Sequence, residues 1–294
     1  MVGYMDQLMY GPIRTKDWSR QIEGEGGKWK AYLITENAND VEVGENADVV
    51  VLYAHGGGYT LGHPMVTFAI FVRWIKYWKT THDANTHIVS VSYGLTPEHS
   101  FPSQRNTFVQ CYQWLVHEKG INPSRIAFAG DSAGGNLVLI SALHIIKNPT
   151  LLAVPPPSCI LGISPFVSGL STSMSWKLNS EFDYISDYWL DARAQCYLRG
   201  TNLKKDDGAV SPLFEKSLHG LPRMWMCVGD CEVFRDDVVA FARKANEDGV
   251  STEIVVEKGN VHNYAVAWSL ARNGAEKKAM KQMGKFIFGE TCNQ

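Results

Sequence analysis

The chain has 294 residues, of which 45% are hydrophobic and 20% are charged, and its formal net charge is −2. This is ordinary globular composition, with room for one large α/β domain or two small ones. Acidic and basic residues are interspersed, which argues against a nucleic-acid surface. The chain has no apolar run long enough to span a bilayer and no signal-peptide pattern, so we expect a cytoplasmic protein with no stable membrane insertion.

Apolar runs of strand length alternate with segments of helical length. Strands are predicted at 29–35, 49–54, 87–93, 126–129, 159–163, 224–228 and 252–257, and helices at 67–78, 104–119, 136–146, 236–247 and about 264–288. Such alternation predicts an α/β fold with a mostly parallel central sheet and helices on both faces. The rhythm is weak over residues 1–28, where 4–10 are expected to form a helical turn or to lie over a pocket. It breaks again over 165–215, a long aromatic excursion with a helix-like piece at 188–198.

The six cysteines include no CxxC pair and have no dense spacing. We therefore expect reduced thiols and no metal site.

The segment Gly130-Asp131-Ser132-Ala133-Gly134 fits the pattern G-x-S-x-G between a predicted strand and a predicted helix. In that context the serine sits on a sharp turn at the carboxyl end of the strand. Its hydroxyl faces a helix N-terminus, where backbone N–H groups favour negative charge. The alternative interpretation is that Ser132 merely caps the helix.

A serine nucleophile needs a base, an acid that orients the base, and donors for the oxyanion. His262 fits the base, because it lies in a short loop between the last predicted strand and the last helix. The loop after the strand 224–228 carries two candidate acids, Asp230 and Glu232, whereas Asp236 or Asp237 is expected to cap the next helix.

The oxyanion donors are predicted from His55-Gly56-Gly57-Gly58, which follows the strand 49–54. Glycines there let backbone N–H groups approach an oxyanion closely. The amide of Ala133, the residue after the nucleophile, would complete the hole. On its own the glycine run could be a simple turn.

Four segments together resemble the hormone-sensitive-lipase-like branch of the α/β-hydrolases. They are His55–Gly58, Tyr93-Gly-Leu-Thr-Pro-Glu98 with Phe101-Pro102, Gly130-Asp-Ser-Ala-Gly-Gly135 and Val261-His262. The resemblance covers roughly residues 48 to 288. It implies a serine esterase without a cofactor, with Ser132 as nucleophile, His262 as base, and the amides of Gly57, Gly58 and Ala133 in the oxyanion hole.

The family usually has an aspartate three residues before an Arg-Asp-Asp/Glu run. Here that position is Glu232, ahead of Arg235-Asp236-Asp237, so Glu232 is preferred as the acid and Asp230 is the alternative. The arginine that usually follows the tyrosine of the second segment is Gly94 here, and we expect its loss to affect local loop packing and stability more than chemistry.

The resemblance also implies a small helical cap on a single α/β domain spanning residues 1–294, formed by residues 1–28 and 166–210. Tyr59, Asp131, Tyr188 and Trp189 are the candidates for substrate binding, and other cap aromatics that could line the pocket are Trp176, Phe182, Tyr184 and Tyr197. An aromatic pocket favours short- to medium-chain acyl esters or esters of hydrophobic alcohols.

The sequence therefore predicts a serine carboxylesterase acting on a small-molecule ester, in its sharpest form a deacetylase of a hydrophobic metabolite, and a homodimer is the expected assembly if there is one. Two alternatives share the same pocket: a hydrolase-like small-molecule receptor without turnover, and an acyl transferase or lyase. Because receptors of this kind typically lack the histidine of the triad, His262 argues against the first.

Overall fold

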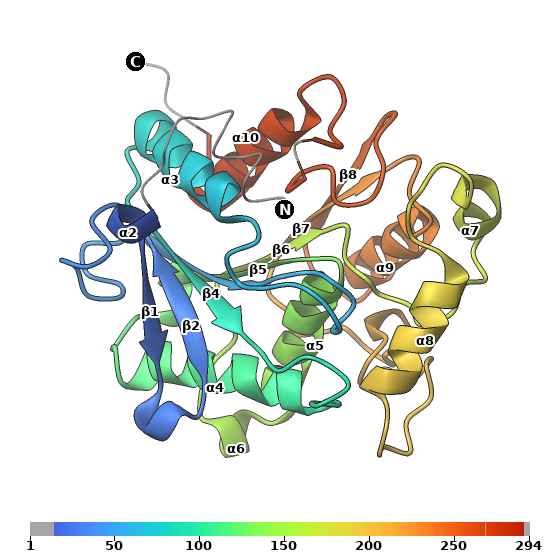
Figure 1. Cartoon of the computed structure of the whole chain (residues 1–294), viewed down its shortest axis with the longest axis horizontal. Coiled ribbons are helices and arrows are strands. Elements are labelled where there is room, and N and C mark those ends of the chain that lie inside the picture. The colour runs from blue at the N-terminus through green and yellow to red at the C-terminus, as the bar shows by residue number, and fades with distance from the viewer. Residues whose placement is uncertain (1–14, 268, 291–294) are drawn as a thin grey trace.

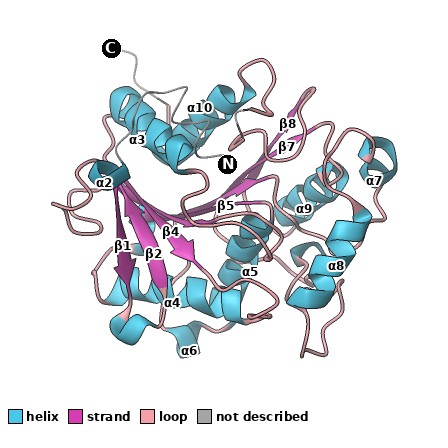
Figure 2. Ribbon diagram, in the orientation of Figure 1, coloured by secondary structure: helices cyan, strands magenta, loops and turns pink. Residues whose placement is uncertain are grey.

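The computed structural model describes residues 15–267 and 269–290. Its eight strands form one sheet in the order β1-β2-β4-β3-β5-β6-β7-β8, in which β1, β2 and β4 pair antiparallel and all other neighbours pair parallel (Figures 1 and 2). The strands are β1 Ser19–Glu23, β2 Lys30–Ile34, β3 Val49–Ala54, β4 Thr86–Ser92, β5 Ile126–Asp131, β6 Cys159–Ile163, β7 Met224–Gly229 and β8 Thr252–Glu257. The predicted α/β fold with a mostly parallel sheet is confirmed.

Helices cover both faces of the sheet (Figure 1). The longer helices are α3 Phe68–His82, α4 Ser103–His117, α5 Ala133–Lys147, α8 Asp187–Tyr197, α9 Arg235–Glu247 and α10 Ala275–Phe288, and the short ones are α2 Thr15–Trp18, α6 Pro149–Leu152 and α7 Met174–Asn179. Side chains of α3 and α10 form one core with one sheet face, and those of α4, α5 and α9 form a second core with the other. Both faces of the central strands are thus buried, and every residue of β3 and β5 is buried, which explains the continuous apolar runs that begin both strands.

The prediction for the last helix was wrong in length, since α10 begins at Ala275 rather than near Tyr264. Asn263, Asn273 and Gly274 adopt positive φ angles of 62°, 54° and 69°. An α-helix cannot contain that left-handed backbone, so the apolar side chains before Ala275 are buried from turns instead of from a helix.

Residues 15–28 do not lie over the carboxyl ends of the central strands, where the cap was expected. They contain α2 and the edge strand β1, and three strands separate β1 from β5 in the sheet. Sequence patterning did not predict β1 because Ile22 is its one buried side chain. The predicted turn at 4–10 lies outside the described residues.

The excursion between β6 and β7 carries α7 and α8, which lie beside the end of the sheet where β5, β6 and β7 finish (Figure 1). Across the described residues no helix is both long enough and apolar enough to cross a membrane, and no group of three or more His, Cys, Asp or Glu side chains is placed to hold a metal ion. The five cysteines of this part of the chain are free thiols, and Cys292 falls outside it.

Candidate active site

Ser132 occupies a tight turn between β5 and α5. Its φ and ψ are 53° and −119°, a strained conformation for a residue with a side chain. The turn needs the flanking glycines, because a Cβ atom on Gly134 would lie 2.0 Å from the carbonyl oxygen of Ala54 and one on Gly130 would lie 2.4 Å from that of Gly134. The Ser132 hydroxyl makes no capping bond to α5, so the cap interpretation fails.

Ser132, His262 and Glu232 form one hydrogen-bonded line. Ser132 Oγ lies 2.9 Å from His262 Nε2, and His262 Nδ1 lies 3.0 Å from Glu232 Oε2. The three residues follow β5, β8 and β7, whose carboxyl ends meet at the same edge of the sheet. Each is buried, with exposed fractions of 8%, 1% and 0%.

The carboxylate of Glu232 is fixed by two donors besides the imidazole. Its Oε1 accepts from Ser164 Oγ at 2.7 Å and from the amide of Gly229 at 2.5 Å. Ser164 Oγ in turn accepts from the amide of Asn263 at 3.1 Å, so it links the acid to the loop of the histidine. Sequence reasoning missed Ser164; the available signal was a small polar residue directly after a buried strand, β6.

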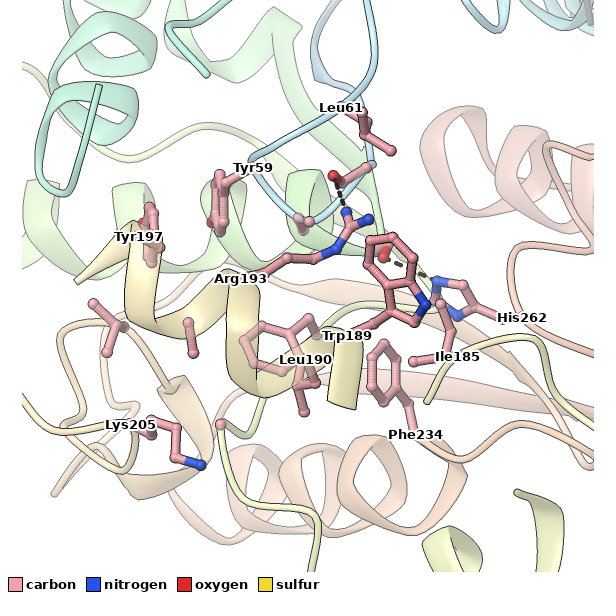
Figure 3. A pocket seen from close by; sticks show the side chains of 18 of the residues that line it. Tyr59, Leu61, Ile185, Trp189, Leu190, Arg193, Tyr197, Lys205, Phe234 and His262 are labelled. Carbon is pink, nitrogen blue, oxygen red and sulfur yellow. Dashed lines mark hydrogen bonds between the residues drawn. The ribbon is translucent and has the colours of Figure 1, made fainter. Parts of the chain in front are cut away.

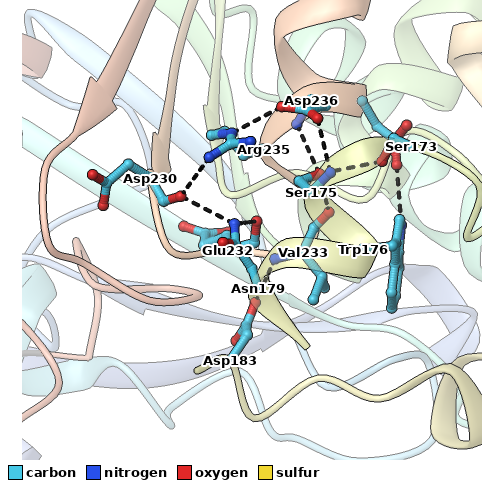
Figure 4. A network of polar contacts seen from close by, with 11 residues as sticks. Ser173, Ser175, Trp176, Asn179, Asp183, Asp230, Glu232, Val233, Arg235 and Asp236 are labelled. Atoms are coloured by element: carbon cyan, nitrogen blue, oxygen red, sulfur yellow. Dashed lines mark hydrogen bonds and ion pairs between the residues drawn. The ribbon is translucent and has the colours of Figure 1, made fainter. Parts of the chain in front are cut away.

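Asp230, the alternative acid, turns its carboxylate elsewhere. Its Oδ1 accepts from the amide of Gly259 at 2.6 Å and from the thiol of Cys231 at 3.3 Å. The backbone of the same loop is fastened by Asn179 of α7, whose Nδ2 donates to the carbonyl oxygens of Asp230 at 3.0 Å and Glu232 at 2.7 Å (Figure 4). Of the two candidates, Glu232 is the one in contact with the imidazole.

The pKa values of His262 and Asp131 are both raised. Burial acts to lower the pKa of His262, but the hydrogen bond and negative charge of Glu232 outweigh it, so the pKa lies above the ordinary value of 6.5. Burial raises the pKa of Asp131, against the hydrogen bonds from Tyr53 and the amide of Gly56.

The glycine run follows β3 and enters the site with positive φ angles of 113° at Gly57 and 62° at Gly58. Within the described residues, the amides of Gly57, Gly58 and Ala133 donate no hydrogen bond to the protein. All three residues line one pocket together with Ser132. Three unused donors beside a serine hydroxyl are the arrangement that could hold an oxyanion.

His55, the residue before the three glycines, is held by hydrogen bonds and ring stacking. Its Nδ1 lies 2.7 Å from the carbonyl oxygen of Gly56, and its ring stacks on Tyr93 at 4.3 Å, while the Tyr93 hydroxyl donates to the carbonyl of His55 at 2.5 Å. Burial lowers the pKa of His55 to about 4, so the imidazole is neutral at pH 7 and fills a structural position.

The pocket has a volume of about 350 Å³ and opens between the catalytic loops and α8 (Figure 3). Its walls are mostly apolar and aromatic, with Tyr59, Leu61, Phe166, Tyr184, Ile185, Trp189, Leu190, Tyr197, Val210 and Phe234 among the lining residues. Of the substrate-binding candidates, Tyr59 and Trp189 line it. The cap aromatics Tyr184 and Tyr197 also line it.

Two other substrate-binding candidates do not reach the pocket. Tyr188 precedes Trp189 on α8, and the 100° turn per residue points its ring outward, leaving it 80% exposed. Asp131 is 4% exposed and accepts from Tyr53 Oη at 2.7 Å, the amide of Gly56 at 2.9 Å and Asn263 Nδ2 at 3.0 Å. Its carboxylate therefore links the loops of the site by hydrogen bonds. The sequence did not show whether Asp131 contacts substrate or other loops.

Two further cap aromatics also lie away from the pocket. Trp176 is buried and donates its indole N–H to Asp237 at 3.3 Å, and the Phe182 side chain is 66% exposed.

The fold and this serine–histidine–carboxylate arrangement are typical of hydrolases, and the comparisons with known proteins agree. The model of the α/β hydrolase fold family matches residues 51–266, and the chain belongs to that family. It is 29% identical to an esterase of Acinetobacter venetianus over 232 residues, which are 78% of this chain and 72% of the relative. It is 28% identical to an ethyl acetate hydrolase of Pseudomonas putida over 241 residues, with 80% and 71% covered.

The solved structures include an esterase of the bacterial hormone-sensitive lipase family, which superposes with a TM-score of 0.79 at 27% identity and covers 98% of this chain and 88% of that one. The predicted hormone-sensitive-lipase-like family and the enzyme class, a carboxylic ester hydrolase, are confirmed.

Proposed function

We propose that this chain is a serine carboxylesterase for small esters with short to medium acyl chains. The observation that carries the proposal is the continuous line from Ser132 Oγ through the His262 imidazole to the Glu232 carboxylate, with steps of 2.9 and 3.0 Å. These three residues lie beside a pocket lined by backbone N–H groups that donate to no other part of the described protein.

The reaction follows from these positions. His262 Nε2 takes the proton of Ser132 Oγ as that oxygen attacks the ester carbonyl carbon, and Glu232 stabilises the imidazolium that forms. The amides of Gly57, Gly58 and Ala133 hold the oxyanion, which collapses as the alkoxide leaves with the proton from His262. Water, deprotonated by His262, then attacks the acyl carbon, and the bond to Ser132 Oγ breaks as His262 returns the proton to that oxygen and the acid is released.

The size of the pocket supports the substrate class. A volume of about 350 Å³ is near the lower end of the roughly 300–1,000 Å³ usual for small-molecule pockets. Residues 166–210 serve as the cap, since α8 supplies Trp189, Leu190 and Arg193 to the wall. A small acyl group such as acetate on a hydrophobic alcohol suits such a wall. A cytoplasmic location and a homodimer stay predictions from the sequence.

The test is the hydrolysis of p-nitrophenyl esters from acetyl to long acyl chains by the natural enzyme and by Ser132→Ala. Activity that falls toward long chains and drops by about 10⁴-fold or more in the variant supports the proposal. A folded protein that turns over no ester and does not react with a fluorophosphonate at Ser132 overturns it in favour of a ligand-binding role. Acyl transfer to an added alcohol in preference to water would instead indicate an acyl transferase.

A further inference from the structure

Arg193 of the cap helix α8 reaches across the pocket to the glycine run. Its Nη1 donates to the carbonyl oxygen of Gly57 at 2.7 Å (Figure 3). The same oxygen accepts from the amides of Thr60 at 3.2 Å and Leu61 at 3.0 Å, which belong to the turn itself. Arg193 thus adds a charged donor from a separate part of the chain.

This carbonyl belongs to the peptide unit that joins Gly57 to Gly58. A peptide unit is planar and trans, so its C=O and N–H point in opposite directions. A bond that fixes the Gly57 carbonyl therefore also fixes the direction of the Gly58 N–H, one of the proposed oxyanion donors. A charged donor on the carbonyl also polarises the unit and strengthens its N–H as a donor.

The surroundings of Arg193 fit this role. Within the described residues the guanidinium has no carboxylate partner, and it lies 4.9 Å from the centre of the Trp189 ring. Gly58 leaves room for it, because a Cβ atom there would lie 2.6 Å from both Cδ and Nη1 of Arg193. The arginine side chain therefore packs directly on the donor residue.

A second contact joins the same helix to the same loop. Tyr197, one turn after Arg193 on α8, stacks on Tyr59 with ring centres 4.0 Å apart and an angle of 2° between the planes. Residues four apart share a helix face, so one face of α8 holds the glycine run at two points.

We propose that Arg193 is a positioning residue that holds the Gly57–Gly58 peptide in the orientation in which the Gly58 N–H serves the oxyanion. The cap helix α8 then orients one oxyanion donor in addition to lining the pocket. This inference rests on the proposed esterase function.

The experiment compares Arg193→Gln and Arg193→Lys with Arg199→Gln. Arg199 is a matched control, since its guanidinium also donates to a backbone carbonyl, that of Pro97, and it does not line the pocket. For each protein, kcat and KM are measured on p-nitrophenyl acetate, together with the inhibition constant of a trifluoromethyl ketone that forms an oxyanion on the serine. The melting temperature reports folding.

Loss of one oxyanion donor lowers kcat by about 10²–10³-fold, so disorder in one donor should lower it by about tenfold in Arg193→Gln. We expect KM to change less than about twofold, and the inhibitor to weaken by the same factor as kcat/KM, because only the tetrahedral species uses the hole. Arg193→Lys keeps a charged donor and should fall between Arg193→Gln and the natural enzyme. Arg199→Gln should keep the natural kcat.

An unchanged kcat in folded Arg193→Gln would overturn the inference while leaving the esterase assignment intact. So would a rise in KM alone, because Arg193 would then bind substrate directly. Absence of turnover in the natural enzyme and in Arg199→Gln would instead remove the proposed function itself. If Arg193→Gln does not fold, Arg193→Lys alone decides through the same kcat and inhibitor readouts.

Discussion

Asp131 and Asn263 link the loop of Ser132 to the loop of His262: Asn263 Nδ2 donates to Asp131 Oδ2 at 3.0 Å. One residue precedes Ser132, the proposed nucleophile, and the other follows His262, the proposed base. The other carboxylate oxygen of Asp131 accepts from Tyr53 and from Gly56, at the start of the glycine run. A single buried carboxylate therefore connects three loops whose relative positions set the geometry of the reaction.

The Asp131–Asn263 contact predicts a rescue by exchange. Asp131→Asn replaces the charged acceptor of three hydrogen bonds with a neutral amide, and in Asn263→Asp two carboxylates meet, so each single variant should lose about 1–3 kcal/mol of stability. The double exchange restores a donor opposite an acceptor, and we expect it to be more stable and more active than either single variant. A thermal or denaturant double-mutant cycle with parallel kcat measurements checks this. Purely additive losses would contradict it.

Glu232 and Asp230 are distinguished by their contacts. Glu232→Gln should lower kcat by about 10⁴-fold, because the neutral amide cannot stabilise the imidazolium and can bond the imidazole in its wrong tautomer. Asp230→Asn keeps an oxygen that can accept from the amide of Gly259 but removes its charge, and it should keep kcat within about threefold while lowering stability by about 1 kcal/mol. Steady-state kinetics on both purified variants decides the matter, and the reverse ranking would assign the acid to Asp230.

The raised pKa of His262 fixes the direction of the pH dependence. In the proposed mechanism the neutral imidazole is the base, so kcat/KM should rise with pH and reach half its maximum above pH 6.5. In Glu232→Gln the two largest influences that raise this pKa, the charge and the charged hydrogen bond of Glu232, are gone, whereas the burial that lowers it and the smaller raising effects of Asp183 and Asp131 remain. The residual activity should therefore reach its half-maximum at a lower pH than in the natural enzyme. A shift to higher pH would show that Glu232 does not control the base.

The position of Leu190 in the pocket predicts that its replacement changes the preference for acyl chain length. Its side chain lines the pocket, so Leu190→Ala opens space for extra methylene groups. We expect the ratio of kcat/KM on long to short p-nitrophenyl esters to rise by about tenfold, the usual effect of one or two methylene contacts. Tyr188→Ala, two positions earlier on α8 with an outward ring, is the control and should leave the ratio unchanged. An equal ratio in both variants would place the acyl chain elsewhere.

Much of this molecule was predictable from local patterns. Seven strands and most helix positions followed from apolar periodicity, because burial on both sheet faces imposes continuous apolar runs. The edge strand β1 was not predicted, because it buries only one side chain. Helix α10 was predicted too long, because asparagines in left-handed conformation leave the apolar periodicity of the segment intact. Ser132 and His262 were identifiable because motif and loop position constrain them.

The order of elements, the candidate nucleophile, the glycine run and the family could be read from the chain alone, because each depends on neighbours in sequence. The folded structure was needed to show which carboxylate meets His262, that Asp131 links loops while Tyr188 faces outward, and that Arg193 reaches Gly57, 136 positions away. These contacts join segments far apart in the chain, and side-chain direction at such contacts is set by packing that no local pattern encodes.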